Sequence, residues 1–361
     1  MNYTFDIEAL SYDVLTLDAV IPAPPNTMEH PGSYAVVLRE EALSRRYNRV
    51  GLALKLIPLG PAEHPGLALW DGVELGMASL VQNLLAQAGL APRVYGLALV
   101  NGTHAAQITD YVTEGDHLPR IPDLMRTFKH LGVQTRKNWD ASPNRGNWRN
   151  GLFVDFSGLY LTGEAVDTLV GWVHERATLK KGVPAGSAYQ EVRALGIPGD
   201  RPSTREFPDG LPLDGMSVLD IGCNLGHFSR LAVDRGAVRV VGVDHGETAL
   251  LCRFIHTLLG YWGVDVVDAT LPKEGSLLPH IAFDVAVCLS AVKYLGDAAA
   301  VPWLAHLAPT LWLEGHGDIE VDHYLPALEQ SYQTVERLAD ATDNKCRAQF
   351  LCTNGGDSED E

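Results

Sequence analysis

Cysteine and long hydrophobic runs are scarce in this chain of 361 residues. Its five cysteines form no CxxC pair and no zinc-ligand spacing, which excludes a disulfide framework or a zinc ribbon as the basis of the fold. The first residues contain neither a basic nor an apolar leader, and no apolar run is long enough to cross a bilayer. We therefore expect a reduced, cytoplasmic protein without membrane insertion.

Positive charge is also scarce, because 28 lysines and arginines are set against 45 acidic residues and the formal net charge is −17. No basic cluster stands out, which argues against a nucleic-acid partner, since phosphate binding needs concentrated positive charge. A small anionic substrate held by one or two arginines stays compatible with this balance. The length and the hydrophobic content of 46% suffice for two cores, so we predict two domains.

The most informative stretch runs from residue 216 to residue 246, MSVLDIGCNLGHFSRLAVDRGAVRVVGVDHG. The apolar run 218–221 predicts a buried parallel strand, a glycine turn follows it, and a helix begins near His227. A second apolar run, 238–243, predicts a strand that ends in Asp244. Glycines allow close backbone approach, and an acid at a strand end can accept both ribose hydroxyls. The unit therefore indicates a nucleoside-like cofactor.

The turn reads D-x-G-x-N-x-G, with Asp220 at the strand end, and it resembles motif I of class I S-adenosylmethionine-dependent methyltransferases. Residues 241–244 resemble motif II of the same family. The alternative is a Rossmann-like unit for a nicotinamide cofactor, although that would show G-x-G-x-x-G after the strand. The resemblance implies S-adenosyl-L-methionine as cofactor, with Asp220 toward its methionine amino end and Asp244 on its ribose. The implied cofactor-binding residues are Asp220, Gly222, Cys223, Asn224, Gly226, Asp244, His245, Asp268, Ala269 and Ser290.

Downstream runs complete an α/β domain over residues 206–354, followed by an acidic tail at 355–361. The resemblance implies a Rossmann-like seven-stranded methyltransferase sheet. It places Asp268 near the adenine amino group and residues 283–290 in the strand nearest the transferred methyl. The expected elements are a helix at 247–259 and strands at 264–269, 283–290, 310–316, 334–338 and 348–352.

Catalytic candidates lie just past the predicted strand ends, where ligands of open parallel sheets bind. They are His316, Glu314 and Lys293. Methyl transfer from a sulfonium is an in-line displacement, so the protein positions the acceptor and, for a hydroxyl or amine, removes a proton. His316 is the preferred base because its pKa lies near neutrality, and His245 is second; the alternative for either is a hydrogen-bonded structural histidine. A phosphate or carboxylate acceptor would need only cations.

The amino-terminal part, residues 1–165, predicts strands at 34–38 and 50–57, a helix at 71–88, and strands at 94–100 and 106–112. This is the element order of a kinase amino-terminal lobe. Lys55 and Glu74 are nineteen residues apart, the spacing of the phosphate-holding lysine and its helix glutamate in protein-kinase-like folds. The resemblance, also to sugar kinases, implies an α+β kinase-like domain with a possible nucleotide site of Lys55, Glu74, Asp140, Asn144 and Asp155.

In an active kinase, Asp140 would be the base, and Asn144 and Asp155 would hold magnesium beside ATP; otherwise no metal is expected. The chain departs from the pattern, because it lacks a glycine-rich flap and has no His-Arg before Asp140. A degenerate lobe that binds substrate or a partner is therefore an equal alternative. In the plainest alternative Lys55 and Glu74 are surface charges and Asp155 is a capping acid.

A helical connector at 166–205 links the two domains, and Arg201 and Arg205 near its end are candidates for an anionic substrate group or are merely solvated. The combination resembles bifunctional kinase-methyltransferases that modify glycan ends, in which the domain order is reversed. We expect a methyltransferase for a small-molecule or carbohydrate-like acceptor, with the first domain binding substrate or a partner. The alternatives are a bifunctional kinase-methyltransferase and a non-catalytic regulatory binding protein. The oligomeric state is not predicted.

Overall fold

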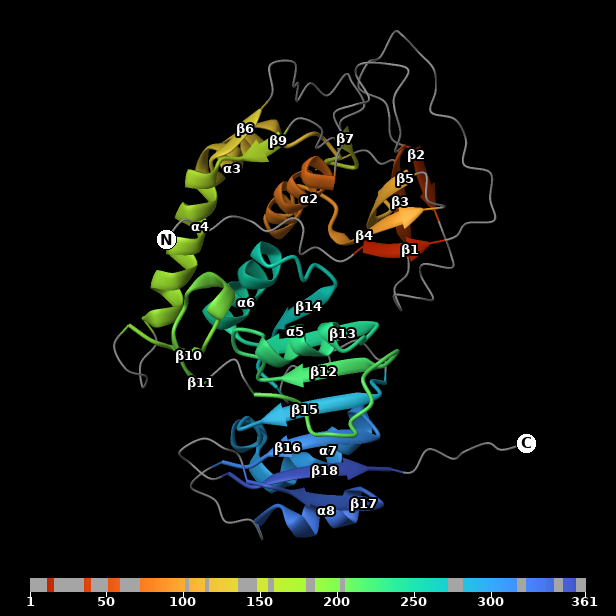
Figure 1. Ribbon diagram of the computed structural model, residues 1–361, viewed down its shortest axis with the longest axis vertical. Coiled ribbons are helices and arrows are strands. Elements are labelled where there is room, and N and C mark those ends of the chain that lie inside the picture. Colours follow the sequence, from red (N-terminus) through yellow and green to blue (C-terminus); the bar gives the residue numbers. More distant parts are fainter. Residues whose placement is uncertain are drawn as a thin grey trace, which may run out of the picture. The chain divides into compact units, whose positions relative to one another are not determined.

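A computed structural model gives the fold of the chain (Figure 1). It describes residues 12–15, 36–39, 51–58, 72–100, 104–113, 117–135, 148–154, 159–179, 186–201, 205–271, 282–316, 323–340 and 347–354. The chain divides into two units: Met1–Val173 with Thr257–Gly263, and His174–His256 with Val264–Glu361. Among the described residues, no helix combines the length and apolar character that crossing a membrane requires.

The second unit is built on a seven-stranded sheet with the order β14-β13-β12-β15-β16-β18-β17 (Figure 1). Only β18 runs antiparallel to its neighbours, and the other pairs are parallel. The predicted mostly parallel α/β sheet is thus confirmed. The strands are β12 (Ser217–Ile221), β13 (Arg239–Asp244), β14 (Val264–Asp268), β15 (Val285–Leu289), β16 (Thr310–Glu314), β17 (Thr334–Leu338) and β18 (Gln349–Thr353).

The strand order reverses at β12, whose neighbours are β13 on one side and β15 on the other. In open α/β sheets, ligands bind outside the carboxyl ends of the strands at such a switch point. The helices of this unit are α5 (His227–Asp234), α6 (Gly246–Leu258), α7 (Val301–Leu307) and α8 (Leu325–Ser331). The fold therefore directs attention to the carboxyl ends of β12 and β15.

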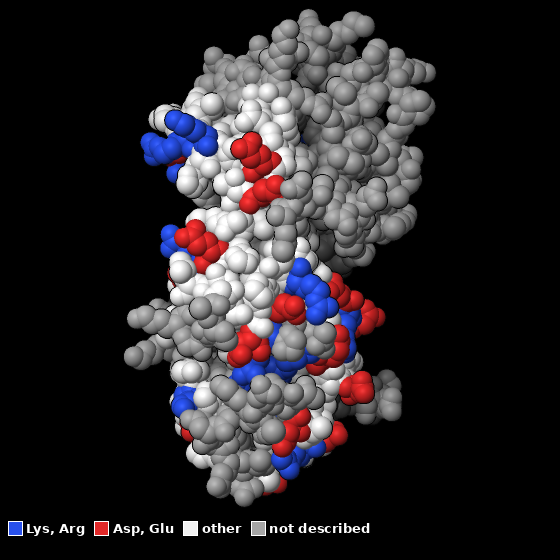
Figure 2. All heavy atoms as spheres, turned by 60° about the vertical axis from the view of Figure 1, so that its left-hand side comes forward, with Lys and Arg blue, Asp and Glu red and all other residues white. Residues whose placement is uncertain are grey.

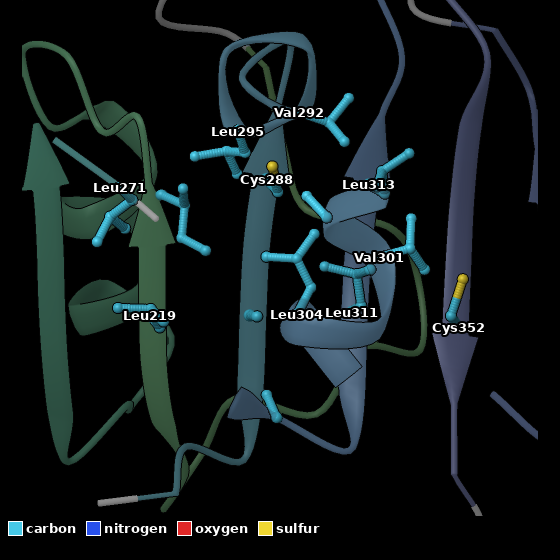
Figure 3. Packing of buried hydrophobic residues seen from close by; sticks show 14 of the residues in the cluster. Leu219, Leu271, Cys288, Val292, Leu295, Val301, Leu304, Leu311, Leu313 and Cys352 are labelled. Atoms are coloured by element: carbon cyan, nitrogen blue, oxygen red, sulfur yellow. The ribbon is translucent and has the colours of Figure 1, made fainter. Parts of the chain in front are cut away.

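Strand residues alternate between the two faces of this sheet. On β12, Leu219 and Ile221 belong to the core that also contains residues of α7 and α8. Asp220 points to the opposite face, where Ser229 of α5 donates a hydrogen bond to it. Figure 3 shows the core on the α7 side, whose labelled members are Leu219, Leu271, Cys288, Val292, Leu295, Val301, Leu304, Leu311, Leu313 and Cys352.

The first unit contains a five-stranded sheet with the order β1-β4-β5-β3-β2. The predicted succession of strand, strand, helix, strand, strand is found as β2, β3, α2, β4 and β5. Only β1 runs parallel to its neighbour, β4. The bounds are β1 (Tyr12–Leu15), β2 (Val36–Arg39), β3 (Leu52–Pro58), α2 (Gly72–Gln87), β4 (Val94–Val100) and β5 (His104–Asp110).

Strand β1, helix α3 (Ile121–Leu131) and the four short strands that follow α3 were not predicted. The helix had a signal, because Leu124, Phe128 and Leu131 are buried at helical spacing and Gly132 ends it in the left-handed conformation. Four short strands follow α3 in pairs, β6 with β9 and β7 with β8. They are β6 (Val133–Thr135), β7 (Trp148–Arg149), β8 (Leu152–Phe153) and β9 (Leu159–Leu161).

The segment predicted as a helical connector begins in α4 (Gly163–Thr178) and continues as two short parallel strands, β10 (Ala188–Gln190) and β11 (Gly199–Arg201). A Cβ at Gly199 would lie 2.0 Å from the backbone nitrogen of Glu191, so no side chain fits there. On the face shown in Figure 2, basic and acidic side chains of the described residues are interspersed and form no extended patch of one sign.

We expect Gly242→Ala to lower the free energy of unfolding by about 1–3 kcal/mol, because overpacking a close contact forces neighbours apart. A Cβ at this position of β13 would lie 3.0 Å from Cys223 Sγ and 3.1 Å from Ser229 Oγ. Urea unfolding measures the change. Gly171→Ala in α4 is the control, since a Cβ there meets nothing within 4 Å. Equal midpoints for Gly242→Ala and the wild type would contradict the prediction.

Candidate functional site

A small pocket, partly open to solvent, lies at the switch point of the seven-stranded sheet. The carboxyl ends of β12 and β15 form its floor, and the start of α5 and the β10–β11 segment form its walls. The pocket thus lies where the fold predicts a ligand. Its lining residues are Tyr189, Gln190, Arg201, Arg205, Asp220, Ile221, Gly222, His227, Phe228, Leu289 and Ser290.

The predicted glycine turn borders this pocket and is tightly wound. Gly222, Asn224 and Gly226 all have positive φ, at 72°, 53° and 79°. The backbone N–H groups of Gly222 and Cys223 both donate to the carbonyl of Val243, which fixes the turn to β13. A Cβ at Gly226 would lie 2.2 Å from Nε2 of His256. Glycine is therefore required here both by the backbone conformation and by space.

Asp220 places a carboxyl group in the pocket although it is almost completely buried. Burial raises its pKa to about 7, and the hydrogen bond from Ser229 Oγ, 2.6 Å from Oδ2, opposes that rise. A cationic ligand group beside it would favour the ionised form. Ser229 was not predicted. The sequence offers one signal for it: Ser229 lies two residues after the start of α5, on the side of the helix that faces the sheet.

Asp244, at the end of β13, faces the same turn. Its Oδ2 accepts a hydrogen bond from the backbone of Asn224 at 2.9 Å, and its Oδ1 accepts one from the backbone of His245 at 2.8 Å. The next strand places Asp268 beside it in register, and Ala269 N–H donates to the Asp244 carbonyl. The structure therefore brings the predicted residues of the turn, β13 and β14 together.

Three further predicted residues near Asp244, namely His245, Asp268 and Asn224, differ in exposure and in hydrogen bonding. The His245 side chain is 74% exposed, and its Nδ1 lies 3.3 Å from Asp244 Oδ1. Oδ1 of Asp268 accepts a hydrogen bond from Gly246 N–H at 2.7 Å, at the start of α6. Asn224 Oδ1 is buried, and among the described residues it has no hydrogen-bond partner. It is thus an acceptor that a ligand can satisfy.

Glu314, a predicted catalytic candidate, lies in a buried cluster of ionic groups. Its side chain is 0% exposed. One oxygen accepts from Arg205 Nη2 at 2.5 Å; the other accepts from Arg347 Nη1 at 2.9 Å and from Ser290 Oγ at 2.5 Å. With both oxygens engaged and no exposure, the geometry favours a positioning role over proton transfer. Arg347, which was not predicted, also donates to Ser290 Oγ at 2.7 Å.

Ser290, predicted to bind the cofactor, and the catalytic candidates Lys293 and His316 follow the ends of strands β15 and β16. Ser290 lines the pocket with a positive φ of 57°. Lys293 is exposed, and His316 is half-buried with its ring centroid 6.2 Å from that of Tyr294, which is itself 75% exposed. Neither Lys293 nor His316 is among the pocket-lining residues. Both remain predictions for contact with an acceptor.

A different histidine, His227, lines the pocket. Burial lowers its pKa, so the ring is neutral at neutral pH. Its Nε2 lies 2.8 Å from the carbonyl oxygen of Arg205, and a carbonyl can only accept, so Nε2 carries the proton. Nδ1 of the neutral ring is then unprotonated. Sequence reasoning located His227 only as the start of the helix.

The arginines from the connector are in the pocket wall. Arg201 is 6% exposed and lies over the Tyr189 ring, 5.5 Å from its centroid. Arg205 lies over the Phe228 ring at 5.4 Å while it pairs with Glu314. The alternative that both are merely solvated is therefore wrong.

In the first unit, the predicted nucleotide site is described only in part. Lys55 Nζ, from β3, donates a hydrogen bond to the carbonyl oxygen of Val154 at 3.2 Å. Glu74 lies on α2, and its side chain is outside the described part. Asp140, Asn144 and Asp155 also lie outside the described residues. Within the described residues, no group of three or more His, Cys, Asp and Glu side chains is arranged to hold a metal ion.

No protein-family model matches the chain. A segment of 94 residues is 36% identical to a ubiquinone biosynthesis O-methyltransferase of Pseudomonas aeruginosa (strain UCBPP-PA14), covering 26% of this chain and 40% of that protein. A segment of 91 residues is 34% identical to the protein of that name from Stutzerimonas stutzeri (strain A1501), covering 25% and 38%. The chain thus spans about two fifths of the length of these curated relatives.

Two solved structures are also similar to parts of the chain. The bifunctional kinase-methyltransferase WbdD has a TM-score of 0.34 at 19% identity, covering 52% of this chain and 39% of that one. Magnesium protoporphyrin IX methyltransferase (ChlM) from Synechocystis PCC 6803, with bound SAM, has a TM-score of 0.34 at 17% identity, covering 53% and 79%.

We expect Glu314→Gln to lower the free energy of unfolding by about 3–5 kcal/mol, because it leaves buried guanidinium groups without their counter-charge. Chemical unfolding of the variant and the wild type measures the difference. Glu336→Gln on β17 is the matched control, because Glu336 is exposed and the change there is expected to stay within about 0.5 kcal/mol. Equal losses in the two variants would contradict the assignment of the buried cluster.

Proposed function

We propose that the second unit is a class I S-adenosylmethionine-dependent methyltransferase. The observation that carries the proposal is the position of the pocket at the β12 switch point, where Asp220 and the glycine turn meet. The curated relatives, which are named as O-methyltransferases, support this reading for the segment they match.

The residues present fit the cofactor. The buried carboxyl of Asp220 suits an ammonium group, because its pKa of about 7 lets a nearby cation hold it ionised. Asp244 suits the ribose, since each carboxylate oxygen has accepting capacity beyond its one backbone donor. Gly222 lines the pocket without a side chain, so a ligand can approach the backbone. When bound, S-adenosyl-L-methionine would supply a methyl group on a sulfonium.

The acceptor is a small-molecule or carbohydrate-like compound that approaches past the tips of β15 and β16. Ser290, held by Glu314 and Arg347, shapes that side of the pocket. For a hydroxyl or amine acceptor, a neutral histidine is the appropriate base. His316, near the strand tip, and His227, in the pocket wall, are the two candidates. A phosphate or carboxylate acceptor would instead rely on Arg201 and Arg205.

Calorimetric titration with S-adenosylhomocysteine tests the proposal. We expect binding by the wild type, and a loss of about 1–3 kcal/mol in Asp244→Ala, because hydrogen bonds to the ribose disappear. Asp209→Ala is the matched control, since Asp209 is exposed in the same unit and is not a pocket residue. Folded wild-type protein that does not bind the ligand would refute the methyltransferase assignment.

For the first unit, we propose a kinase-like lobe that binds substrate or a partner, with a bifunctional kinase-methyltransferase as the second candidate. The favouring observation is Lys55, which lies on a strand between β2 and β5 and donates to the carbonyl of Val154. That carbonyl immediately precedes Asp155, the predicted metal ligand. In the bifunctional candidate, ATP and magnesium at this lobe would phosphorylate the acceptor that the second unit methylates.

Thermal unfolding with ATP and magnesium separates these candidates. If the lobe binds nucleotide, a concentration of 100 times Kd stabilises the protein by about 2.7 kcal/mol, and Lys55→Met loses this effect. Lys129→Met is the control, because Lys129 is exposed on α3. If the wild type is not stabilised, the bifunctional candidate is refuted. Absence of both ATP and S-adenosylhomocysteine binding would favour a non-catalytic regulatory protein.

A further inference from the structure

Two cysteines and a histidine are packed together behind the glycine turn. Sγ of Cys223, in the turn, lies 3.9 Å from Sγ of Cys252, on α6. The ring of His256, one helical turn further, lies 3.8 Å from Cys252 Sγ through Nε2. The two thiols are at most 1% exposed and His256 is 3% exposed. The proposed methyl transfer uses none of these side chains.

The environment makes the two thiols unequal. Burial raises the pKa of the Cys252 thiol, but the hydrogen bond with Cys223 and the nearby imidazole of His256 outweigh burial and lower it overall. The same hydrogen bond and burial raise the pKa of Cys223. Since the thiolate is the nucleophile, Cys252 is the thiol that reacts first.

The other described cysteines lack this arrangement. Cys288 on β15 and Cys352 on β18 are buried, and burial raises the pKa of each to about 12. Within the described part of the chain, Cys223 and Cys252 form the sulfur pair recorded at hydrogen-bond distance. Cys346 lies outside the described residues. Among the described cysteines, reactivity toward an oxidant is therefore concentrated at Cys223 and Cys252.

The turn has little room to follow a moving sulfur. Cys223 N–H donates to Val243, its carbonyl accepts from Gly226 N–H, and the next residue, Asn224, donates to Asp244. The space beside the Cys223 sulfur is also limited, since a Cβ built on Gly242 would lie only 3.0 Å from it. A disulfide needs the two sulfurs at about 2.05 Å, so closing the pair from 3.9 Å requires rotation of the two side chains or a movement of the turn or of α6.

We propose that Cys223 and Cys252 form an oxidation site in which a disulfide distorts the cofactor turn and weakens cofactor binding. The first half of this proposal, disulfide formation, stands independently. The second half rests on the proposed methyltransferase function, because it assumes that the turn holds S-adenosylmethionine. Cofactor binding and disulfide formation are then linked reciprocally, so that a bound cofactor disfavours the disulfide by the same free energy by which the disulfide weakens cofactor binding.

The oxidant is a small peroxide, since bulky reagents cannot reach thiols that are so deeply buried. The Cys252 thiolate attacks one peroxide oxygen, the O–O bond breaks, and hydroxide leaves, which gives a sulfenic acid. Cys223 sulfur then attacks the sulfenic sulfur, loses its proton, and water leaves as the S–S bond forms. Overall, two thiols and one hydrogen peroxide give one disulfide and two waters.

The test treats the full-length wild-type protein with hydrogen peroxide, blocks remaining thiols with N-ethylmaleimide, and maps peptides by mass spectrometry. We expect one cross-linked peptide pair that contains Cys223 and Cys252, formed more slowly when S-adenosylhomocysteine is present. Titration of the oxidised protein with S-adenosylhomocysteine should show affinity at least tenfold weaker than before oxidation, and dithiothreitol should restore it.

Variants make the result specific. Cys252→Ser should abolish the cross-link and leave binding insensitive to peroxide, whereas Cys352→Ser, another buried cysteine, should behave as the wild type. If a variant fails to fold, reversal by dithiothreitol in the wild type still decides. No cross-linked peptide, or a cross-linked protein that binds S-adenosylhomocysteine unchanged, overturns the proposal. A cross-link in protein that never binds the ligand upholds the oxidation site and refutes the methyltransferase function instead.

Discussion

The second unit depends on one close approach, that of the turn at residues 222–226 to β13 and α6. Two N–H groups of the turn share the Val243 carbonyl, and Gly226 passes so near His256 that no side chain fits. This contact sets the height of the turn above the sheet. Asp220 lies at the same carboxyl edge, where Asp244 accepts a hydrogen bond from the Asn224 backbone. Gly222, which has no side chain, leaves the backbone at that edge open to a ligand.

Much of this arrangement is local, which is why the sequence predicts it. The helix after the turn begins at His227 as expected, and β17 has the predicted bounds, because apolar periodicity and glycines act over a few residues. The register that sets Asp244 beside Asp268 also follows from parallel strands of similar length. Of the five residues predicted for a nucleotide site, Asp140, Asn144 and Asp155 lie outside the described part of the chain.

The ionic cluster around Glu314 shows what a sequence pattern does not reveal. Its partners are 109 and 33 residues away along the chain, and neither arginine has a local signature that pairs it with a strand-end acid. The prediction of Glu314 as catalytic followed from its position at the end of β16, and the position is right. What decides its role is burial and the occupancy of both oxygens, which only the tertiary structure supplies.

That cluster also gives the pocket a dependence on the order in which the chain is made. Arg205 precedes all seven strands of the sheet in the chain. Arg347 leads into β18, which lies between β16 and β17. Along the chain, Glu314 follows its first cationic partner, Arg205, by 109 residues and precedes its second, Arg347, by 33. Ser290 has its full set of partners only after β18 has emerged and inserted. The wall of the pocket is thus completed only when β18, the last of the described strands in chain order, joins the sheet, which ties ligand competence to the finished sheet.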